Sequence, residues 1–425
     1  MTSITDYNKC TGCSACASIC SHNAIRLVPD KYGYVLPVID ETRCVDCHLC
    51  TKTCPNNQPP TYFTPTRGYG LHTKNTEEQL TSNSGGVAST VARYIIRNGG
   101  VVYGCTNENM RHTCHIRVDN EDNLMKLKSS KYVQSDMTYI YPSVKKDLKE
   151  GKKVLFIGTP CQVAGLKSFL KKDYETLFTI DFVCHGVPSQ VFVNDELDKI
   201  STKHNISGSR LLYRYKRLMT WYERKHANAR KNWYTSTYGL HFVDNNGKLI
   251  YQEVFPKSRY MTGFLMGLTY RESCYRCNYA RQERVSDFTC GDYYEDKTLV
   301  NDLSGYARMV SMLSVNSKKG EYLWDKVSDE FEYTERDYKK IVKDHPQLNK
   351  PMPRHRLRDI FLKLIISEGY SVAISKCTDQ DSQKFIRSYR KQKIRYFIYK
   401  VPGTSLLFQN ILKPLQLFLK RDFQV

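Results

Sequence analysis

The sequence predicts a chain of α+β and α/β class built from successive parts, and three observations lead to this prediction. Two copies of one cysteine motif lie near the N-terminus, strand and helix patterns then alternate, and the last part is basic with helical periodicity. We therefore expect a cysteine-rich domain at 1–58, a mixed α/β domain in two regions, 67–150 and 151–320, and a mostly helical basic region at 321–425.

The N-terminal domain is defined by a cysteine spacing that occurs twice. Each copy has the form Cys-x-x-Cys-x-x-Cys-x-x-x-Cys. Three thiolates at every third residue let a short loop bind three irons of a cubane cluster, while a more distant cysteine binds the fourth. Two-cluster ferredoxins exchange the fourth ligand between motifs, so we predict two 4Fe-4S clusters in a bacterial-type ferredoxin domain. The first takes Cys10, Cys13, Cys16 and Cys54, and the second takes Cys44, Cys47, Cys50 and Cys20.

The residues between the two motifs support a ferredoxin. Residues 24–40 have the pattern of a hairpin, with a turn at Gly33. One departure is Ser21, which follows Cys20 where these ferredoxins usually have proline. Zinc sites and disulfides are the alternatives, but zinc sites usually use two Cys-x-x-Cys pairs.

Composition indicates a globular protein that keeps its cysteines reduced. The chain has 425 residues, 40% of them hydrophobic, and it begins without the apolar run of an export signal. We therefore expect its 16 cysteines to serve metal binding in a reducing cytoplasm. The apolar runs are too short or too interrupted to span a bilayer, so any membrane contact is expected to be peripheral, at the inner face.

Basic residues outnumber acidic ones by 64 to 43, which gives a formal charge of +21. The excess is concentrated at Arg210–Lys231 and Lys384–Lys400, where aromatic residues interleave with the basic ones. Such stretches suit nucleic acid, an acidic electron carrier, an anionic substrate or an anionic membrane, and they also form solvated faces. We expect an acidic carrier, ferredoxin or flavodoxin, and no nucleic acid.

Strand and helix patterns begin after a linker at 56–66. Residues 67–73 predict a strand, and the helix that follows is predicted to be capped by Ser84 and to stop at Gly99. The segment Ser82–Gly86 thus precedes a helix, where free amides favour an anion such as a flavin pyrophosphate. An ordinary helix cap has the same pattern.

Two later strands end in turns that carry cysteines. The strand Val154–Ile157 leads into a helix with Cys161, and the next strand ends at Cys184. In an α/β sheet, ligands gather at the carboxyl ends of such strands, so we expect both thiols at the same edge. Further on, an antiparallel pattern is followed by a Cys-x-x-Cys turn at Cys274 and Cys277.

Five stretches of this α/β part form a recognisable set. They are NSGGVASTVARYIIRNGGVVYG, SSKYVQSD, KKVLFIGTPCQVAGLKSFL, TIDFVCHGVPS and CYRCNYARQERVSDFTCGD. In the same order, they resemble the beta-subunit family of coenzyme F-420 hydrogenases and dehydrogenases, whose bacterial members often carry a preceding ferredoxin domain. The resemblance covers most of residues 67–295 and ends near residue 320.

The resemblance implies a flavoprotein whose α/β domain binds FAD. Electrons would pass from a ferredoxin-like donor through the clusters to FAD and then to a small organic substrate, and use of coenzyme F-420 would depend on the host. Two glycines would allow close backbone approach, and Lys131 would offset flavin charge unless it is a surface lysine. The family's flavin segments correspond here to Ser84, Gly85, Gly86, Lys131, Tyr132, Val133 and Gln134.

The resemblance also implies a third 4Fe-4S cluster, on Cys161, Cys184, Cys274 and Cys277. Zinc or unliganded thiols fit the same four residues. His185 and Lys131 are the candidate catalytic residues, although His185 could instead orient its loop. Asp292 is a candidate for binding ribose or substrate, or for capping a turn. The cysteines without partners at metal spacing are predicted to be packed thiols: Cys105, Cys114, Cys290 and Cys377.

We therefore predict an iron-sulfur flavoprotein oxidoreductase, with two alternatives. The chain could be an electron-transfer beta subunit that needs a partner such as a hydrogenase or formate dehydrogenase, or it could be a non-enzymatic scaffold.

Residues 387–421 mix basic, aromatic and leucine side chains as peripheral membrane helices do, although an ordinary packed helix pair has the same composition.

Overall fold

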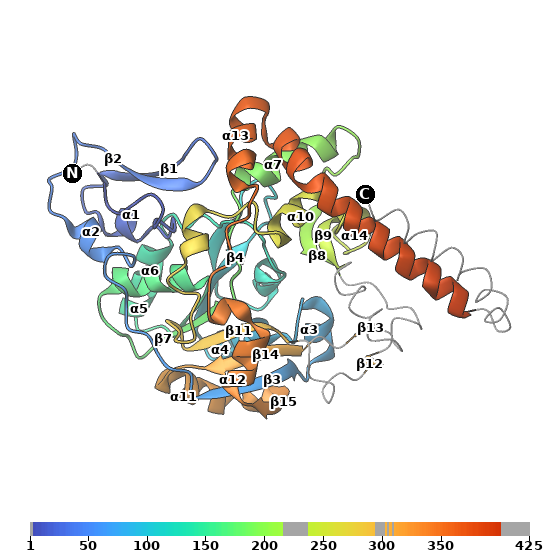
Figure 1. Ribbon diagram of the computed structural model, residues 1–425. Coiled ribbons are helices and arrows are strands. Elements are labelled where there is room, and N and C mark those ends of the chain that lie inside the picture. Colours follow the sequence, from blue (N-terminus) through green and yellow to red (C-terminus); the bar gives the residue numbers. More distant parts are fainter. Residues whose placement is uncertain (1–2, 216–236, 294–301, 304–305, 308–309, 401–425) are drawn as a thin grey trace.

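An eight-stranded mixed sheet lies at the centre of the structure, a computed structural model that describes residues 3–215, 237–293, 302–303, 306–307 and 310–400 (Figure 1). The strand order is β15-β3-β14-β11-β7-β6-β4-β5. The four strands β11, β7, β6 and β4 are parallel, and the strands outside them pair antiparallel. The strands are β3 (Arg67–Thr73), β4 (Val101–Thr106), β5 (Cys114–Val118), β6 (Val154–Ile157), β7 (Leu177–Phe182), β11 (Phe288–Tyr293), β14 (Val310–Val315) and β15 (Phe331–Arg336).

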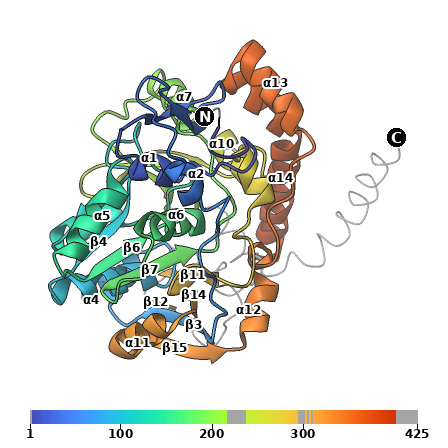
Figure 2. The ribbon, with the colours of Figure 1, turned by 90° about the vertical axis from the view of Figure 1, so that its left-hand side faces the viewer.

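Helices cover both faces of this sheet. Alternating residues of β6 face opposite layers, with Leu155 packed beside α4 and α11 and Phe156 packed beside α5 and α6. Figure 2 shows α5 and α6 between the sheet and the N-terminal helices. The covering helices are α4 (Val87–Arg97), α11 (Lys318–Val327), α5 (Ile140–Lys149) and α6 (Pro160–Leu170).

The N-terminal domain has the predicted ferredoxin-type hairpin. Strand β1 (Ile25–Pro29) pairs antiparallel with β2 (Val35–Ile39), and the short helices α1 (Ala15–Ile19) and α2 (Leu49–Thr53) each follow a cysteine loop. Helix α1 packs on α6, so this domain shares a hydrophobic cluster with the sheet layer.

A second layer contains the predicted antiparallel strands and an aromatic-rich core. Its three-stranded sheet has the order β10-β9-β8, and the C-terminal helices pack on it (Figure 1). Its elements are α7 (Gln190–Ser201), β8 (Arg210–Arg214), β9 (Tyr238–Val243), β10 (Leu249–Val254), α10 (Arg259–Leu265), α13 (Arg358–Glu368) and α14 (Tyr370–Lys400). The remaining elements are α3 (Thr76–Thr81), α12 (Tyr338–Asp344), β12 (Asp302–Leu303), β13 (Tyr306–Ala307) and 3-10 turns at Asp122–Leu127, Glu272–Arg276, Ser328–Glu330 and Pro346–Leu348.

Two sequence predictions differ from the structure. Residues 321–400 are mostly helical as predicted, but they also supply β15 to the sheet. The sequence analysis missed this strand because it is polar on its exposed face and carries little hydrophobic signal. The cap predicted for Ser84 is wrong. Helix α4 is capped by Gly86 at φ 82°, and the Ser84 hydroxyl instead donates to the Val310 carbonyl at 3.0 Å.

Tyr34, from the turn of the ferredoxin hairpin, anchors the N-terminal domain in the second layer. Its hydroxyl donates to Thr269 O at 2.8 Å and accepts a hydrogen bond from Arg358 Nη2 at 3.1 Å. Its ring meets Phe192 edge-on at 5.9 Å. Arg358 is 1% exposed and also donates to Leu268 O and Tyr270 O. The ferredoxin-type domain is therefore bound to the C-terminal helices.

We expect Tyr34→Phe to lower the free energy of unfolding by about 1–3 kcal/mol, because it leaves buried partners without a hydrogen bond. The matched control is Tyr7→Phe, which removes a hydroxyl bonded to Asp30 on a side chain that is 46% exposed. Urea denaturation monitored by circular dichroism provides the measurement. Equal losses in the two variants would contradict the anchoring role of Tyr34.

Candidate functional site

The predicted ligands of the first cluster lie together beneath the surface. Cys10, Cys13 and Cys54 are buried, and Cys16 is half-buried. Burial, followed by the charges of the neighbouring thiols, raises the pKa of Cys13 to about 12 and raises the pKa of Cys16. Cys54 from the second motif is among the neighbours that act on Cys16, so the structure places it with the first motif's cysteines.

The predicted ligands of the second cluster line one hollow nearer the surface: Cys20, Cys44, Cys47 and Cys50. Cys47 is exposed, and the amide of Ala24 donates to the Cys20 sulfur at 3.4 Å. Amide hydrogen bonds to ligand sulfurs are one of the means by which proteins tune iron-sulfur clusters. The two cysteine sets of the domain therefore differ in solvent access.

The third cysteine set lines a single cavity at the carboxyl edge of the sheet: Cys161, Cys184, Cys274 and Cys277. Strands β6 and β7 are parallel neighbours, which brings Cys161 and Cys184 to the same edge as predicted. Burial raises the pKa of Cys274 to about 12 and of Cys277 to about 11, and neighbouring thiols add to both shifts. Thr11, from the loop between the first set's Cys10 and Cys13, lines this cavity too.

The start of α6 fixes Cys161. Thr159 and Gln162 form a capping box, and Pro160 occupies the first helical turn. The Thr159 hydroxyl lies 3.2 Å from the Cys161 sulfur. Farther along the helix, a methyl group at Gly165 would lie 3.0 Å from the sulfur of Cys13, so this glycine permits the close approach of the two cysteine sets.

The chemistry of these three sets fits iron-sulfur clusters. Without a bound metal, neighbouring thiols in a desolvated site stay protonated. A bound cation favours loss of their protons and offsets the free-energy cost of the negative charge that forms. Within the described residues, no group of three or more His, Cys, Asp or Glu side chains is arranged to hold one metal ion. Four thiolates on one zinc must all lie about 2.3 Å from it, whereas a cubane spreads its ligands around four irons.

The first predicted flavin segment is engaged with the sheet. The Gly85 amide donates to Ser311 Oγ at 2.8 Å, and its carbonyl accepts from the Thr73 amide. A methyl group at Gly85 would lie 2.3 Å from Leu71 O. Packing of this loop on β3 and β14 therefore requires Gly85, and the positive φ of the helix cap favours Gly86.

The second predicted flavin segment lies beside the first. Asn83 donates to Ser129 Oγ and Ser130 Oγ at 3.2 and 3.1 Å. Lys131 is half-buried, donates to Leu127 O and Lys128 O, and has its pKa lowered to about 8 by burial. It is therefore not a simple surface lysine.

The other residues of that segment face different neighbours. Tyr132 and Val133 pack in the aromatic core of the second layer. Gln134 reaches the first cysteine loop, with its amide nitrogen 3.4 Å from Thr11 O and Gly12 O. The structure thus brings Ser84, Gly85 and Gly86 near the start of the second segment but directs Gln134 toward the ferredoxin-type domain.

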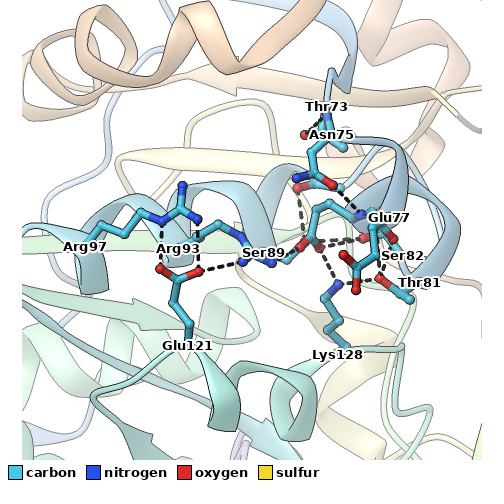
Figure 3. Close-up of polar contacts among 12 residues, drawn as sticks. Thr73, Asn75, Glu77, Thr81, Ser82, Ser89, Arg93, Arg97, Glu121 and Lys128 are labelled. Atoms are coloured by element: carbon cyan, nitrogen blue, oxygen red, sulfur yellow. Dashed lines mark hydrogen bonds and ion pairs between the residues drawn. The ribbon is translucent and has the colours of Figure 1, made fainter.

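The buried carboxylate of Glu78 joins α3 to side chains near the two segments, and Figure 3 labels its partners Lys128, Arg93 and Ser82. Glu78 of α3 pairs with Lys128 at 2.6 Å and with Arg93 at 2.7 Å, and Ser82 donates to it. Arg93 also pairs with Glu121. Burial opposes ionisation of Glu78, but the bonds from Lys128, Ser89 and Arg93 outweigh it, so the pKa lies below the ordinary 4.5.

Asp292 and His185 lie near the third set. Asp292 pairs with the buried Arg214 at 2.8 Å. His185 lines the cavity of the third set, and desolvation lowers its pKa. His345, which the sequence analysis did not single out, is buried, whereas His185 is exposed, and the pKa of His345 is lowered to about 4 by burial and by His185. The imidazole of His345 is therefore neutral near pH 7.

Two buried arginines at the third set were also missed from the sequence. Arg284 pairs with Asp181 at 3.0 Å, and Arg271 donates to Cys10 O at 2.8 Å and to Gln134 Oε1 at 2.7 Å. Both arginines line the cavity of the third set. Arg271 stands three residues before Cys274, but its partners come from distant parts of the chain, and no local pattern indicates them.

Several predictions fall partly or wholly outside the described residues. These are the basic stretch at 210–231 beyond residue 215, most side chains of the stretch at 384–400, and the membrane contact predicted for 387–421, of which the part beyond residue 400 is not described. No helix in the described part of the chain is long and apolar enough to cross a membrane.

We expect Glu78→Gln to destabilise the protein by about 3 kcal/mol at pH 7, because it removes the buried negative charge that pairs with Lys128 and Arg93. The folded-state pKa lies below 4.5, so the carboxylate stabilises the fold above that pH and loses this effect as the pH falls through the folded value. The gap between wild type and variant should therefore shrink on acidification. Thermal unfolding from pH 7 to 4 measures it, with the exposed Glu77→Gln as the control.

Comparison with known proteins supports the sequence-based resemblance. Residues 9–58 match the model of the 4Fe-4S dicluster domain, and residues 151–340 match the model of the C-terminal part of the coenzyme F-420 hydrogenase/dehydrogenase beta subunit. A search of curated protein sequences gives no significant match. A chain in the xenon-derivatised F-420-reducing NiFe hydrogenase complex from Methanosarcina barkeri is 14% identical, with a TM-score of 0.40 over 75% of this chain and 92% of that one. A TM-score of this size indicates only a distant likeness.

The two matched regions contain all three cysteine sets. The dicluster region spans the first two sets, and the beta-subunit region spans the third. The prediction of iron-sulfur clusters in the N-terminal domain is confirmed by the dicluster match. The chain therefore joins a 4Fe-4S dicluster domain to a C-terminal domain of the coenzyme F-420 hydrogenase/dehydrogenase beta-subunit family.

Proposed function

We propose that this chain is an iron-sulfur electron-transfer subunit of a larger oxidoreductase and that each of its three cysteine sets holds a 4Fe-4S cluster. One observation carries the proposal: the three cysteine sets lie in succession between the surface and the carboxyl edge of the sheet. The second set includes the exposed Cys47, the first is mostly buried, and Thr11 of the first loop lines the cavity of the third set. The beta-subunit match supports an oxidoreductase role.

The surface around the second set suits contact with an electron carrier. Val45 and Leu49, on either side of Cys47, are 57% and 36% exposed. Exposed apolar side chains at a redox centre favour a transient partner, whose interface is small. We expect an acidic ferredoxin or flavodoxin in this position, with the catalytic partner subunit near the third set.

The chain's own residues would bind the clusters and control their surroundings. When bound, 4Fe-4S clusters carry single electrons, with potentials set by charge, hydrogen bonds and exposure. The twelve cysteines would supply thiolates, burial of most of the first set limits its contact with water, and the Ala24 amide donates to a ligand sulfur. The imidazole of His185 at the third cavity could form a hydrogen bond there.

A flavin reductase that acts on a small substrate is the second candidate. The hydrogen bonds from Asn83 to Ser129 and Ser130 favour it, because they join the residues that immediately precede the family's two flavin segments. FAD would lie there if it binds, with Lys131 as the nearby cation. Use of coenzyme F-420 is suggested only by the family.

Iron content tests the third cluster. We expect about twelve irons per chain after anaerobic purification and about eight in Cys184→Ala, because that change removes one of four ligands. The control is Cys290→Ala, which removes a buried thiol outside the three sets and should keep the wild-type iron content. Iron, zinc and acid-labile sulfide are measured in each sample. A wild-type content of about eight irons, unchanged in Cys184→Ala, would contradict a third cluster.

The same preparations separate the two candidate functions. Stable co-purification with a larger metalloenzyme and no released flavin is the result expected for an electron-transfer subunit. One flavin per chain, together with turnover of a small substrate by the isolated protein and reduced ferredoxin, would instead support the reductase.

A further inference from the structure

Arg271 connects the first cysteine set with the third. Its main chain is hydrogen-bonded beside the third set: its amide donates to Val187 O, and its carbonyl accepts from the Cys274 amide, both at 3.0 Å. Its side chain contacts the first set. Nε donates to Cys10 O at 2.8 Å, and Nη2 donates to Val35 O and lies 4.0 Å from the Cys10 sulfur.

The guanidinium of Arg271 is buried without a carboxylate. The residue is 3% exposed, and its side-chain hydrogen bonds go to two carbonyls, the Gln134 amide oxygen and the Cys10 sulfur. No carboxylate among the described residues pairs with it. A buried positive charge without a counter-charge is strongly unfavourable. The thiolates of a bound cluster would supply this negative counter-charge.

The loop of the first set is shaped around this side chain. Gly12, at φ 64°, lies so close that a methyl group there would be 2.8 Å from Arg271 Nη1 and 2.4 Å from Gln134 Nε2. A positive φ and this lack of space both favour glycine. Gln134 in turn accepts from Arg271 Nη1 at 2.7 Å, so the guanidinium is held from two sides.

We propose that Arg271 is a positioning residue that holds the first cluster's loop against the third cysteine set and raises the reduction potential of that cluster. Reduction adds negative charge to the cluster, and a nearby positive charge in a medium of low dielectric constant favours the reduced form. The inference rests on the dicluster domain and goes beyond the proposed function. It requires neither a third cluster nor a partner subunit, so it can fail or hold independently of them.

The test is a redox titration of the anaerobically purified full chain, monitored by electron paramagnetic resonance. Arg271→Met removes the charge, and we expect the midpoint potential of one cluster to fall by at least about 59 mV. This shift corresponds to a tenfold change in a one-electron equilibrium constant. Arg271→Lys keeps the charge and should retain most of the wild-type midpoint. The second cluster, which Arg271 does not contact, serves as the internal reference.

The matched control is Arg276→Met. Arg276 stands between Cys274 and Cys277 but is exposed, so its charge is screened by water and its loss should leave both ferredoxin-domain midpoints unchanged. An unchanged midpoint in Arg271→Met at full iron content would overturn the proposal. Equal shifts in Arg271→Met and Arg276→Met would do the same.

If Arg271→Met loses cluster iron, its midpoint potential cannot be compared with that of the wild type, and a milder variant tests the proposal instead. Gln134→Leu removes the amide oxygen that holds Nη1 but leaves the charge in place. We expect this variant to retain its iron and to show a smaller decrease in the same midpoint. In that case, an unchanged midpoint in Gln134→Leu would overturn the proposal.

Discussion

Desolvation of cysteine thiols is the constraint on which the rest of this structure depends. Desolvation raises the pKa of Cys13, Cys274 and Cys277, so thiolates form there only when positive charge is supplied. In the proposed clusters iron would provide most of this charge, and Arg271 lies between the first and third sets. Cys13 and Cys277 pack in the hydrophobic cluster that contains α6, and Cys274 packs against the core of the second layer.

The N-terminal domain is therefore part of the main body and not a module on a flexible linker. Tyr34 enters the aromatic core of the second layer, and Cys13 contacts α6 at Gly165. Each of these contacts joins residues far apart in sequence. A relay of electrons between centres depends steeply on their separation, and docking at several points keeps such a separation constant.

Local patterns were sufficient to predict much of the fold. The ferredoxin hairpin, the strand Val154–Ile157 and the thiols Cys161 and Cys184 at one edge follow from periodicity and from the rules of parallel sheets. The edge strand β15 and the contacts of Arg271 depend on long-range pairing, which leaves no local signal. Gly85 shows a further limit, because packing against Leu71 O explains this glycine as well as a flavin would.

The position of β15 also determines when the sheet can be completed during synthesis of the chain. Its partner β3 is the first strand of the sheet to be synthesised, whereas β15 follows every other strand. The edge of β3 that pairs with β15 therefore stays open until residue 336 has left the ribosome. All eight cysteines of the dicluster domain emerge before residue 55. Iron loading of that domain can begin while the sheet is still incomplete.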